Sequence, residues 1–275
     1  MKLRGKKGKM TLKTSEYQPI RQRFGVEIII VLALSLGASA VYSILSLVAS
    51  LTAPKGLAGS VQHINPSASP REWLDFCYQF VGITLAMAPV ALVLYLVWRP
   101  ISSDEHNTAF SAFEKLGFLR PLKFRDFASG LGLAACIGLP GLGLYFGARA
   151  LGLAAQVVPS DLPGYWWAVP MLLLSALRAA LVEEFIIVGY LFNRLTAMGW
   201  SSRSQIWVSA VIRGSYHLYQ GFGGFVGNLA MGLVFGWLYK KFGRLQVLIF
   251  AHFVLDLVSF VGFALLHWLG IQIRM

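Results

Sequence analysis

Long apolar stretches dominate this chain, and they constrain its fold more than any motif does. Reading along the sequence, we distinguish seven of them, at about residues 26–52, 75–98, 128–153, 165–195, 205–219, 225–239 and 246–268. A membrane-crossing helix needs about 20 apolar residues, so the fifth and sixth stretches are short. The pattern predicts an all-α polytopic transmembrane bundle of seven to eight spans. The eighth span would arise if the glycine-rich run around Pro140 breaks the third stretch.

Composition supports this assignment, since 56% of the residues are hydrophobic and only 13% are charged. A soluble domain has about 25% charged residues. We therefore expect a basic cytoplasmic tail over residues 1–25 and one transmembrane domain over residues 26–275, with the chemistry-bearing motifs in a core at 175–260. The first apolar run, of about 27 residues, is too long for the core of a cleavable signal peptide.

The net charge of +12 follows the expected topology of the chain. If the N-terminus lies inside, 18 of the 24 lysines and arginines fall on inside segments and only three fall on outside segments. Such an excess is what the positive-inside rule describes. The sequence therefore predicts a multi-pass protein of the cell membrane with a cytoplasmic N-terminus. The basic N-terminus would contact anionic lipids, and the charge does not indicate nucleic-acid binding.

Acidic side chains are rare in this chain, yet four of the 12 fall within predicted spans: Glu27, Glu183, Glu184 and Asp256. Glu27 lies at the inner edge of the first span, where it can reach the lipid headgroups and needs no special role. A carboxylate in hydrocarbon costs ~2.5–3.5 kcal/mol, and two adjacent carboxylates cost more because like charges repel. The pair Glu183–Glu184 therefore indicates chemistry rather than packing.

Two histidines, His217 and His252, also lie deep in predicted spans. His252 and Asp256 are four residues apart and share a helix face, as do Arg213 and His217. At the helical rise, His252 lies ~10 Å from the inner surface, while Glu183 and His217 lie ~18 Å from it. These side chains are expected to converge in the inner half of the membrane.

The two glutamates cannot point the same way, because adjacent residues on a helix are about 100° apart. One of them can face a site while the other faces a buried cation. Arg213 and Arg178 are the candidate cations, and an unpaired buried arginine would be as costly as an unpaired glutamate.

Such a cluster can hydrolyse an amide. A glutamate with a nearby histidine can activate water, and a second histidine with a polar partner can stabilise an oxyanion. Glu183, His217 and His252 could instead bind Zn²⁺, although an HExxH motif is absent, as is a G-x-S-x-G nucleophile elbow. A buried salt-bridged network that fixes helix register and a proton-relay transporter are the alternatives.

Three motifs in order resemble those of the CPBP intramembrane proteases. They are Glu183-Glu184 followed by Gly189-Tyr190, then RGSYHLYQG, then HFVLD, and together they cover about 180–260. The family includes the eukaryotic CAAX prenyl endopeptidase and bacterial members described as Abi or bacteriocin-processing proteins. The resemblance implies a helical membrane hydrolase with a site open to the cytoplasm. It also implies cleavage of membrane-associated peptides or proteins.

The resemblance implies roles for individual residues. Glu183 would be the catalytic glutamate and would activate water together with His217. His252 would help to stabilise the oxyanion, with Asp256 beside it. Glu184 would support the site without reacting.

Two positions depart from the family pattern. The first motif usually reads EExxxR, but Val188 stands at the arginine position, so Arg213 or Arg178 would supply the cation. Asp256 stands where asparagine is usual; an ionised Asp256 would repel an oxyanion, so it must be protonated, orient His252 or help to hold a metal. The family has been described as metal-dependent and as glutamate-based. We expect catalysis without a cofactor, with Zn²⁺ as the alternative. A catalytically inactive scaffold or immunity-type protein, and a proton-coupled transporter, remain the competing functions.

Overall fold

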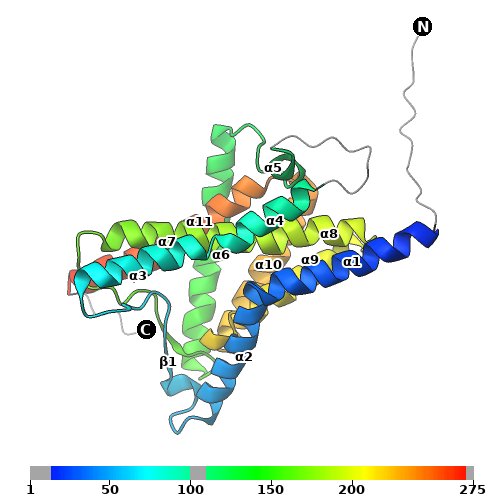
Figure 1. Ribbon diagram of the computed structural model, residues 1–275. Coiled ribbons are helices and arrows are strands. Elements are labelled where there is room, and N and C mark those ends of the chain that lie inside the picture. The colour runs from blue at the N-terminus through cyan, green and yellow to red at the C-terminus, as the bar shows by residue number, and fades with distance from the viewer. Residues whose placement is uncertain (1–13, 100–109, 271–275) are drawn as a thin grey trace.

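The computed structural model describes residues 14–99 and 110–270, and helices dominate it (Figure 1). The side chains of residues 14–21 are outside the description. The helices are α1 (Thr14–Ala33), α2 (Leu36–Thr52), α3 (Glu72–Leu85), α4 (Ala88–Trp98), α5 (Ser111–Lys115), α6 (Phe124–Ala150), α7 (Ala168–Glu183), α8 (Leu191–Ala197), α9 (Ser202–Ser215), α10 (Phe222–Phe242) and α11 (Leu245–Trp268). A π-helical segment, η2 (Glu184–Tyr190), joins α7 to α8, and 3₁₀ turns lie at η1 (Leu57–Gly59) and η3 (Leu218–Gln220).

Four described helices are long and apolar enough to cross a membrane: Glu72–Trp98, Phe124–Ala150, Phe222–Phe242 and Leu245–Trp268. The pair Gln22–Ala33 and Leu36–Thr52, bent by 54°, would make a fifth if it is one span. The protein is thus a helical membrane protein, but the expected seven to eight spans are not supported. The fifth apolar stretch forms only the 14-residue α9, which is shorter than a bilayer requires.

Two further boundaries differ from the sequence expectation. Helix α6 continues without a break through Pro140, so the additional span proposed there is absent. Within an apolar environment, ending the helix would leave several backbone groups unpaired, whereas proline removes only one hydrogen bond. Helix α1 begins at Thr14, inside the expected tail, and residues 1–13 lie outside the described part of the chain.

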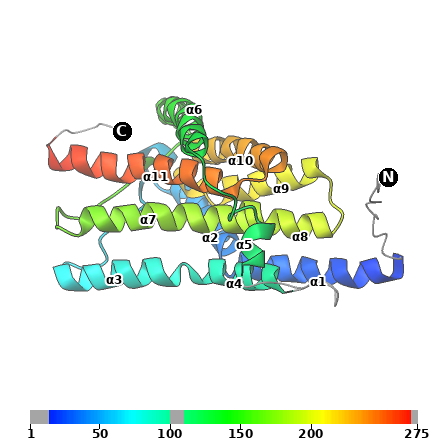
Figure 2. The same ribbon diagram turned by 90° about the horizontal axis from the view of Figure 1, so that it is seen from above.

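The helices form tiers around α7, η2 and α8. Seen from above, α3, α4 and α1 lie along one side of this central run, and α11, α10 and α9 lie along the other (Figure 2). Helix α6 stands almost end-on in that view and packs against α11 and α10. The core is densest at η2, where Ile186, Ile187 and Val188 are fully buried. The central run therefore carries its polar residues into the middle of the molecule.

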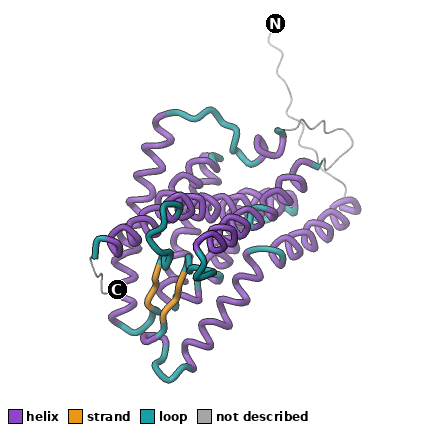
Figure 3. Tube along the Cα trace, turned by 60° about the vertical axis from the view of Figure 1, so that its left-hand side comes forward, coloured by secondary structure: helices purple, strands orange, loops and turns teal. Residues whose placement is uncertain are grey.

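The strands β1 (Val61–His63) and β2 (Gln156–Val158) form a short parallel ladder on the loops at one end of the bundle (Figure 3). The chain just before β2 pairs with the turn before α10, through a bridge between Ala154 and Gly221. Gly221 has a φ of 97°, which a residue with a Cβ rarely adopts. This turn fixes where α10 begins, directly after the segment that carries His217.

Helices α9 and α10 approach each other closely at Gly232. A Cβ at this position would lie 2.7 Å from the Cα of Ala210 and 3.4 Å from the Cδ of Arg213. Only glycine allows this approach without moving the backbone. The close packing holds Arg213 between α10 and the glutamates of α7 and η2.

Candidate active site

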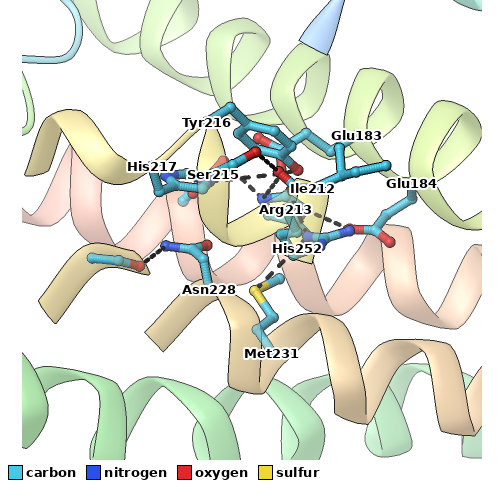
Figure 4. Close-up of polar contacts among 12 residues, drawn as sticks. Glu183, Glu184, Ile212, Arg213, Ser215, Tyr216, His217, Asn228, Met231 and His252 are labelled. Carbon is cyan, nitrogen blue, oxygen red and sulfur yellow. Dashed lines mark hydrogen bonds and ion pairs between the residues drawn. The ribbon is translucent and has the colours of Figure 1, made fainter. Parts of the chain in front are cut away.

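The residues singled out in the sequence come together between α7, α9 and α11 (Figure 4). Glu183 ends α7 and Glu184 begins η2, while Arg213 lies in the last turn of α9. His217 lies in the turn after α9, and α11 carries His252 and Asp256. We call the whole set the Arg213 cluster: Glu183, Glu184, Arg213, Tyr216, His217, His252 and Asp256.

The two glutamates have different environments, as their 100° separation predicts. The Glu184 side chain is fully buried, and its Oε1 accepts a hydrogen bond from Arg213 Nη2 at 2.7 Å. The same oxygen lies 2.8 Å from His252 Nδ1. Glu183 keeps 11% of its side chain exposed, and its Oε2 accepts a hydrogen bond from the Tyr216 hydroxyl at 2.7 Å. Glu183 is therefore the carboxylate that a reactant can reach.

Arg213 is the cation that neutralises this pair. Its side chain is fully buried, and Nη1 lies 3.4 Å from Glu183 Oε2 while Nη2 binds Glu184. The guanidinium also lies over the Phe235 ring, 5.4 Å from its centroid. Of the two arginines considered from the sequence, Arg213 contacts the glutamates. Arg178 Nε is buried and has no hydrogen-bond partner within the described part of the chain.

The two histidines approach Glu183 from different elements. His217 Nε2 and His252 Nε2 each lie 4.0 Å from Glu183 Oε2, which is too long for a direct hydrogen bond. His252 Nε2 also lies 3.5 Å from Asp256 Oδ2, one helical turn further along α11. His217 was expected within a span, but it lies in the turn between α9 and η3. The turn releases its ring from the helix face and lets it reach Glu183.

Local sequence explains this turn. Ser215 Oγ donates back to the Ile212 carbonyl at 2.7 Å, which competes with continuation of α9. The His217 amide donates to the Gly214 carbonyl at 3.0 Å, so the last turn tightens before the chain leaves the helix. The end of α9 thereby places Arg213, Tyr216 and His217 around one carboxylate.

The π-helical segment η2 carries Glu184 and is held from the side. A π-turn is rare and is frequently found at functional sites. Ser209 Oγ, fully buried on α9, donates to the Ile187 carbonyl in the middle of this segment at 3.2 Å. This contact satisfies a backbone oxygen that the irregular helix would otherwise leave short of a partner.

Several polar atoms of the Arg213 cluster have no partner. Glu184 Oε2, Arg213 Nε and His217 Nε2 are buried and form no hydrogen bond among the described residues. Buried polar atoms in native proteins are almost always paired with protein or water. The site therefore has unused hydrogen-bonding capacity beside Glu183, as a centre that binds water or a polar reactant requires.

The described part of the chain contains no preformed metal site. Among residues 14–99 and 110–270, no group of three or more histidine, cysteine, aspartate and glutamate side chains is arranged to hold a metal ion. Glu183, His217 and His252 are the residues that could hold one, with both histidine Nε2 atoms 4.0 Å from Glu183 Oε2.

Tyr216 was missed from the sequence. Its only signal is its position next to His217, since an aromatic residue in an apolar segment usually packs in the core. The residue is 5% exposed, and its ring centroid lies 4.8 Å from that of His217.

A second buried cluster lies at the other end of η2, and we call it the Arg194 cluster: Glu27, Tyr190 and Arg194. Glu27 Oε1 accepts hydrogen bonds from Arg194 Nε at 2.6 Å and from the Tyr190 hydroxyl at 3.0 Å. The expectation that Glu27 reaches the headgroups and has no role was wrong, because its side chain is only 12% exposed. The pair ties α1 to α8 at the end of the glutamate-bearing segment.

One comparison with known proteins identifies a family pattern. Residues 165–258 match the family model "Type II CAAX prenyl endopeptidase Rce1-like". The match spans every residue of the Arg213 cluster and confirms the resemblance to the CPBP and CAAX proteases over this part of the chain. No curated protein and no solved structure matched the chain.

Proposed function

Taking as a premise that residues 165–258 carry the CAAX-protease family pattern, we propose that the protein is an intramembrane endopeptidase. It hydrolyses peptide bonds of membrane-associated peptides or proteins. The observation that carries the proposal is the convergence of His217 Nε2 and His252 Nε2 on Glu183 Oε2, each at 4.0 Å. A partly exposed carboxylate between two imidazoles is a constellation for amide hydrolysis.

The nucleophile is a water held between Glu183 and His217. Two groups 4.0 Å apart can both hydrogen-bond one water at about 2.8 Å. Glu183 takes a proton from this water while the water oxygen forms a bond to the scissile carbonyl carbon. The tetrahedral intermediate then expels the amine, which leaves with the proton that Glu183 had accepted, and the carbon–nitrogen bond breaks.

His252 supplies the oxyanion contact. Its Nδ1 is bound to Glu184 Oε1 at 2.8 Å, which fixes the ring and leaves Nε2 facing the site. A protonated Nε2 can donate to the oxygen on which negative charge develops. Asp256 Oδ2, 3.5 Å from that nitrogen, orients the ring instead of contacting the oxyanion itself. In this role Asp256 acts through His252, so its carboxylate does not have to lie against the oxyanion that it would repel.

The active form needs no metal in this proposal. If Zn²⁺ were used, Glu183, His217 and His252 would have to hold it, and the donors would have to move to do so. Stringent chelation separates the two cases. Cleavage that persists in chelator supports the glutamate mechanism, whereas cleavage that stops and returns with added Zn²⁺ overturns it.

The site assignment is tested by mass spectrometry of membrane peptides from cells that express the protein. Wild type should generate new peptide termini, and Glu183→Gln and His217→Ala should each abolish them while the fold survives detergent extraction. Glu114→Gln is the matched control, since Glu114 is exposed on α5. If both site variants keep wild-type activity, the assignment is wrong. If no termini appear but reconstituted protein shows pH-dependent flux, the protein is a transporter; if neither occurs, it is a scaffold.

We further propose a multi-pass location in the cell membrane with the N-terminus in the cytoplasm, where its basic residues meet anionic lipids. The charge distribution of the sequence supports this orientation. A quenched fluorogenic peptide ending in a farnesylated CAAX sequence, compared with the same peptide without the prenyl group, tests the substrate class. Equal cleavage of both peptides would mean that no prenyl group is recognised.

A further inference from the structure

We propose that Tyr216 is a positioning residue that orients Glu183 for its role as base, a role that itself rests on the proposed function. Tyr216 follows the last residue of α9 and is 5% exposed. Its hydroxyl donates to Glu183 Oε2 at 2.7 Å, a shorter contact than those of Arg213, His217 and His252 with this carboxylate.

The division of labour between Tyr216 and Arg213 explains why this contact matters. Arg213 Nη2 binds Glu184 at 2.7 Å, while Nη1 stays 3.4 Å from Glu183. Arg213 therefore makes only a long hydrogen bond to Glu183. The phenol makes the short one, which fixes the direction of the carboxylate and adds no further charge to it.

The same turn provides the partner of the base. Tyr216 and His217 are consecutive, and their rings lie in contact at a tilt of 44°, with centroids 4.8 Å apart. Because one backbone turn carries both side chains, the group that orients Glu183 and the group that shares its water move together. Position 216 therefore links the placement of the carboxylate to that of the imidazole.

Carboxyl labelling tests this role without a known substrate. Dicyclohexylcarbodiimide modifies protonated carboxyl groups in apolar surroundings, and tandem mass spectrometry separates Glu183 from the fully buried Glu184. In detergent at one fixed pH, Tyr216→Phe should label Glu183 about tenfold faster than wild type. A hydrogen bond to a charged group contributes about 1.5–3 kcal/mol, and each 1.4 kcal/mol is tenfold in an equilibrium. The charged groups around Glu183 (Glu184, Arg213, His217, His252 and Asp256) stay the same.

Tyr239→Phe is the matched control, because it removes a hydroxyl that donates to the Leu116 carbonyl at 3.2 Å, away from the carboxylates. It should leave the labelling of Glu183 unchanged. On the farnesylated fluorogenic peptide, Tyr216→Phe should lower kcat, because the base is no longer oriented. KM should stay within twofold of wild type.

The outcomes separate the two proposals. Wild type that cleaves neither peptide and makes no new termini overturns the protease, while the labelling result still decides the role of Tyr216. Unchanged labelling in Tyr216→Phe overturns the positioning role. If the Phe variant does not fold, 3-fluorotyrosine at position 216 keeps the shape and strengthens the donor. It should slow the labelling, and an unaltered rate is again contrary to the proposal.

Discussion

Two arginine-centred clusters flank the π-helical segment, and they differ in how completely they are paired. In the Arg194 cluster each guanidinium nitrogen has an acceptor: Nε binds Glu27 at 2.6 Å, Nη2 the Leu96 carbonyl at 2.5 Å and Nη1 the Asn193 side chain at 3.1 Å. In the Arg213 cluster Nε has no partner, and one cation faces two carboxylates. The first cluster is complete within the protein, and the second is not.

Under the proposed function, this difference would separate a structural ion pair from a reactive one. A buried pair is tolerated when hydrogen bonds satisfy both charges, and the Arg194 cluster meets that condition. The Arg213 cluster holds surplus acid, and buried polar atoms beside Glu183 lack a partner among the described residues. Incomplete pairing thus marks the centre that has capacity left for water and substrate.

The largest expected effect is a loss of cleavage on changing Glu183, with the fold retained. Glu183→Gln should lower cleavage by about 10²–10⁴-fold, the usual contribution of a general base. Its thermal unfolding in detergent should match or exceed that of wild type, since the amide keeps the shape and removes surplus charge. A large drop in unfolding temperature would instead place Glu183 with the structural pairs.

Arg213→Ala should have the next largest effect, on stability. Removing one partner of a buried pair costs about 3–5 kcal/mol, and here two carboxylates lose their cation. The loss is measured as a lower unfolding temperature and a smaller monodisperse fraction in detergent. Wild-type stability in Arg213→Ala would show that the histidines neutralise the pair.

Glu27→Gln should have a smaller effect, which is confined to the stability of the fold. Gln retains one acceptor for Arg194 but not its charge, so we expect a loss of about 1–3 kcal/mol with cleavage per folded molecule unchanged. Asp126→Asn is the control: it weakens an equally short 2.6 Å pair, with Arg244, away from η2, and should likewise leave cleavage per folded molecule unchanged. Lost activity in folded Glu27→Gln protein would erase the distinction between the clusters.

The smallest effect is expected at Asp256. In Asp256→Asn the amide oxygen can still accept from His252, so fluorogenic-peptide cleavage should stay within about fivefold of wild type, the equivalent of about 1 kcal/mol. His252→Ala, assayed in parallel, should lose far more. If Asp256→Asn falls as far as Glu183→Gln, then the Asp256 carboxyl acts in the reaction itself.

The sequence was sufficient to predict the convergence of Glu183, Glu184, His217 and His252, because buried ionisable groups are scarce and their depths along helices can be estimated. Their catalytic roles remain predictions. The sequence narrowed the cation that pairs with the glutamates to two candidates, Arg213 and Arg178. Choosing between them required the α9–α10 packing at Gly232.

Other features were beyond reach for physical reasons. Hydropathy reports apolar length, not direction, so it indicated that the fifth stretch is short, but the 54° bend after Ala33 was invisible. The partnership of Glu27 with Arg194 joins residues 167 positions apart. Tyr216 gave no pattern of its own, since a hydroxyl contact to a carboxylate on another helix leaves no periodicity.

The π-helical segment has a consequence for the chain's tolerance of length changes. A π-turn closes hydrogen bonds one residue further along than an α-helix does, so η2 accommodates an additional residue within almost the same rotation about the helix axis. Deleting one residue from Phe185–Gly189 should therefore give a regular helix in which both clusters still face their partners. Deleting one residue from Leu191–Asn193, which is α-helical, should instead rotate Arg194 by about 100° relative to the glutamates. The π-helical segment is therefore the part of this run that tolerates a loss of one residue.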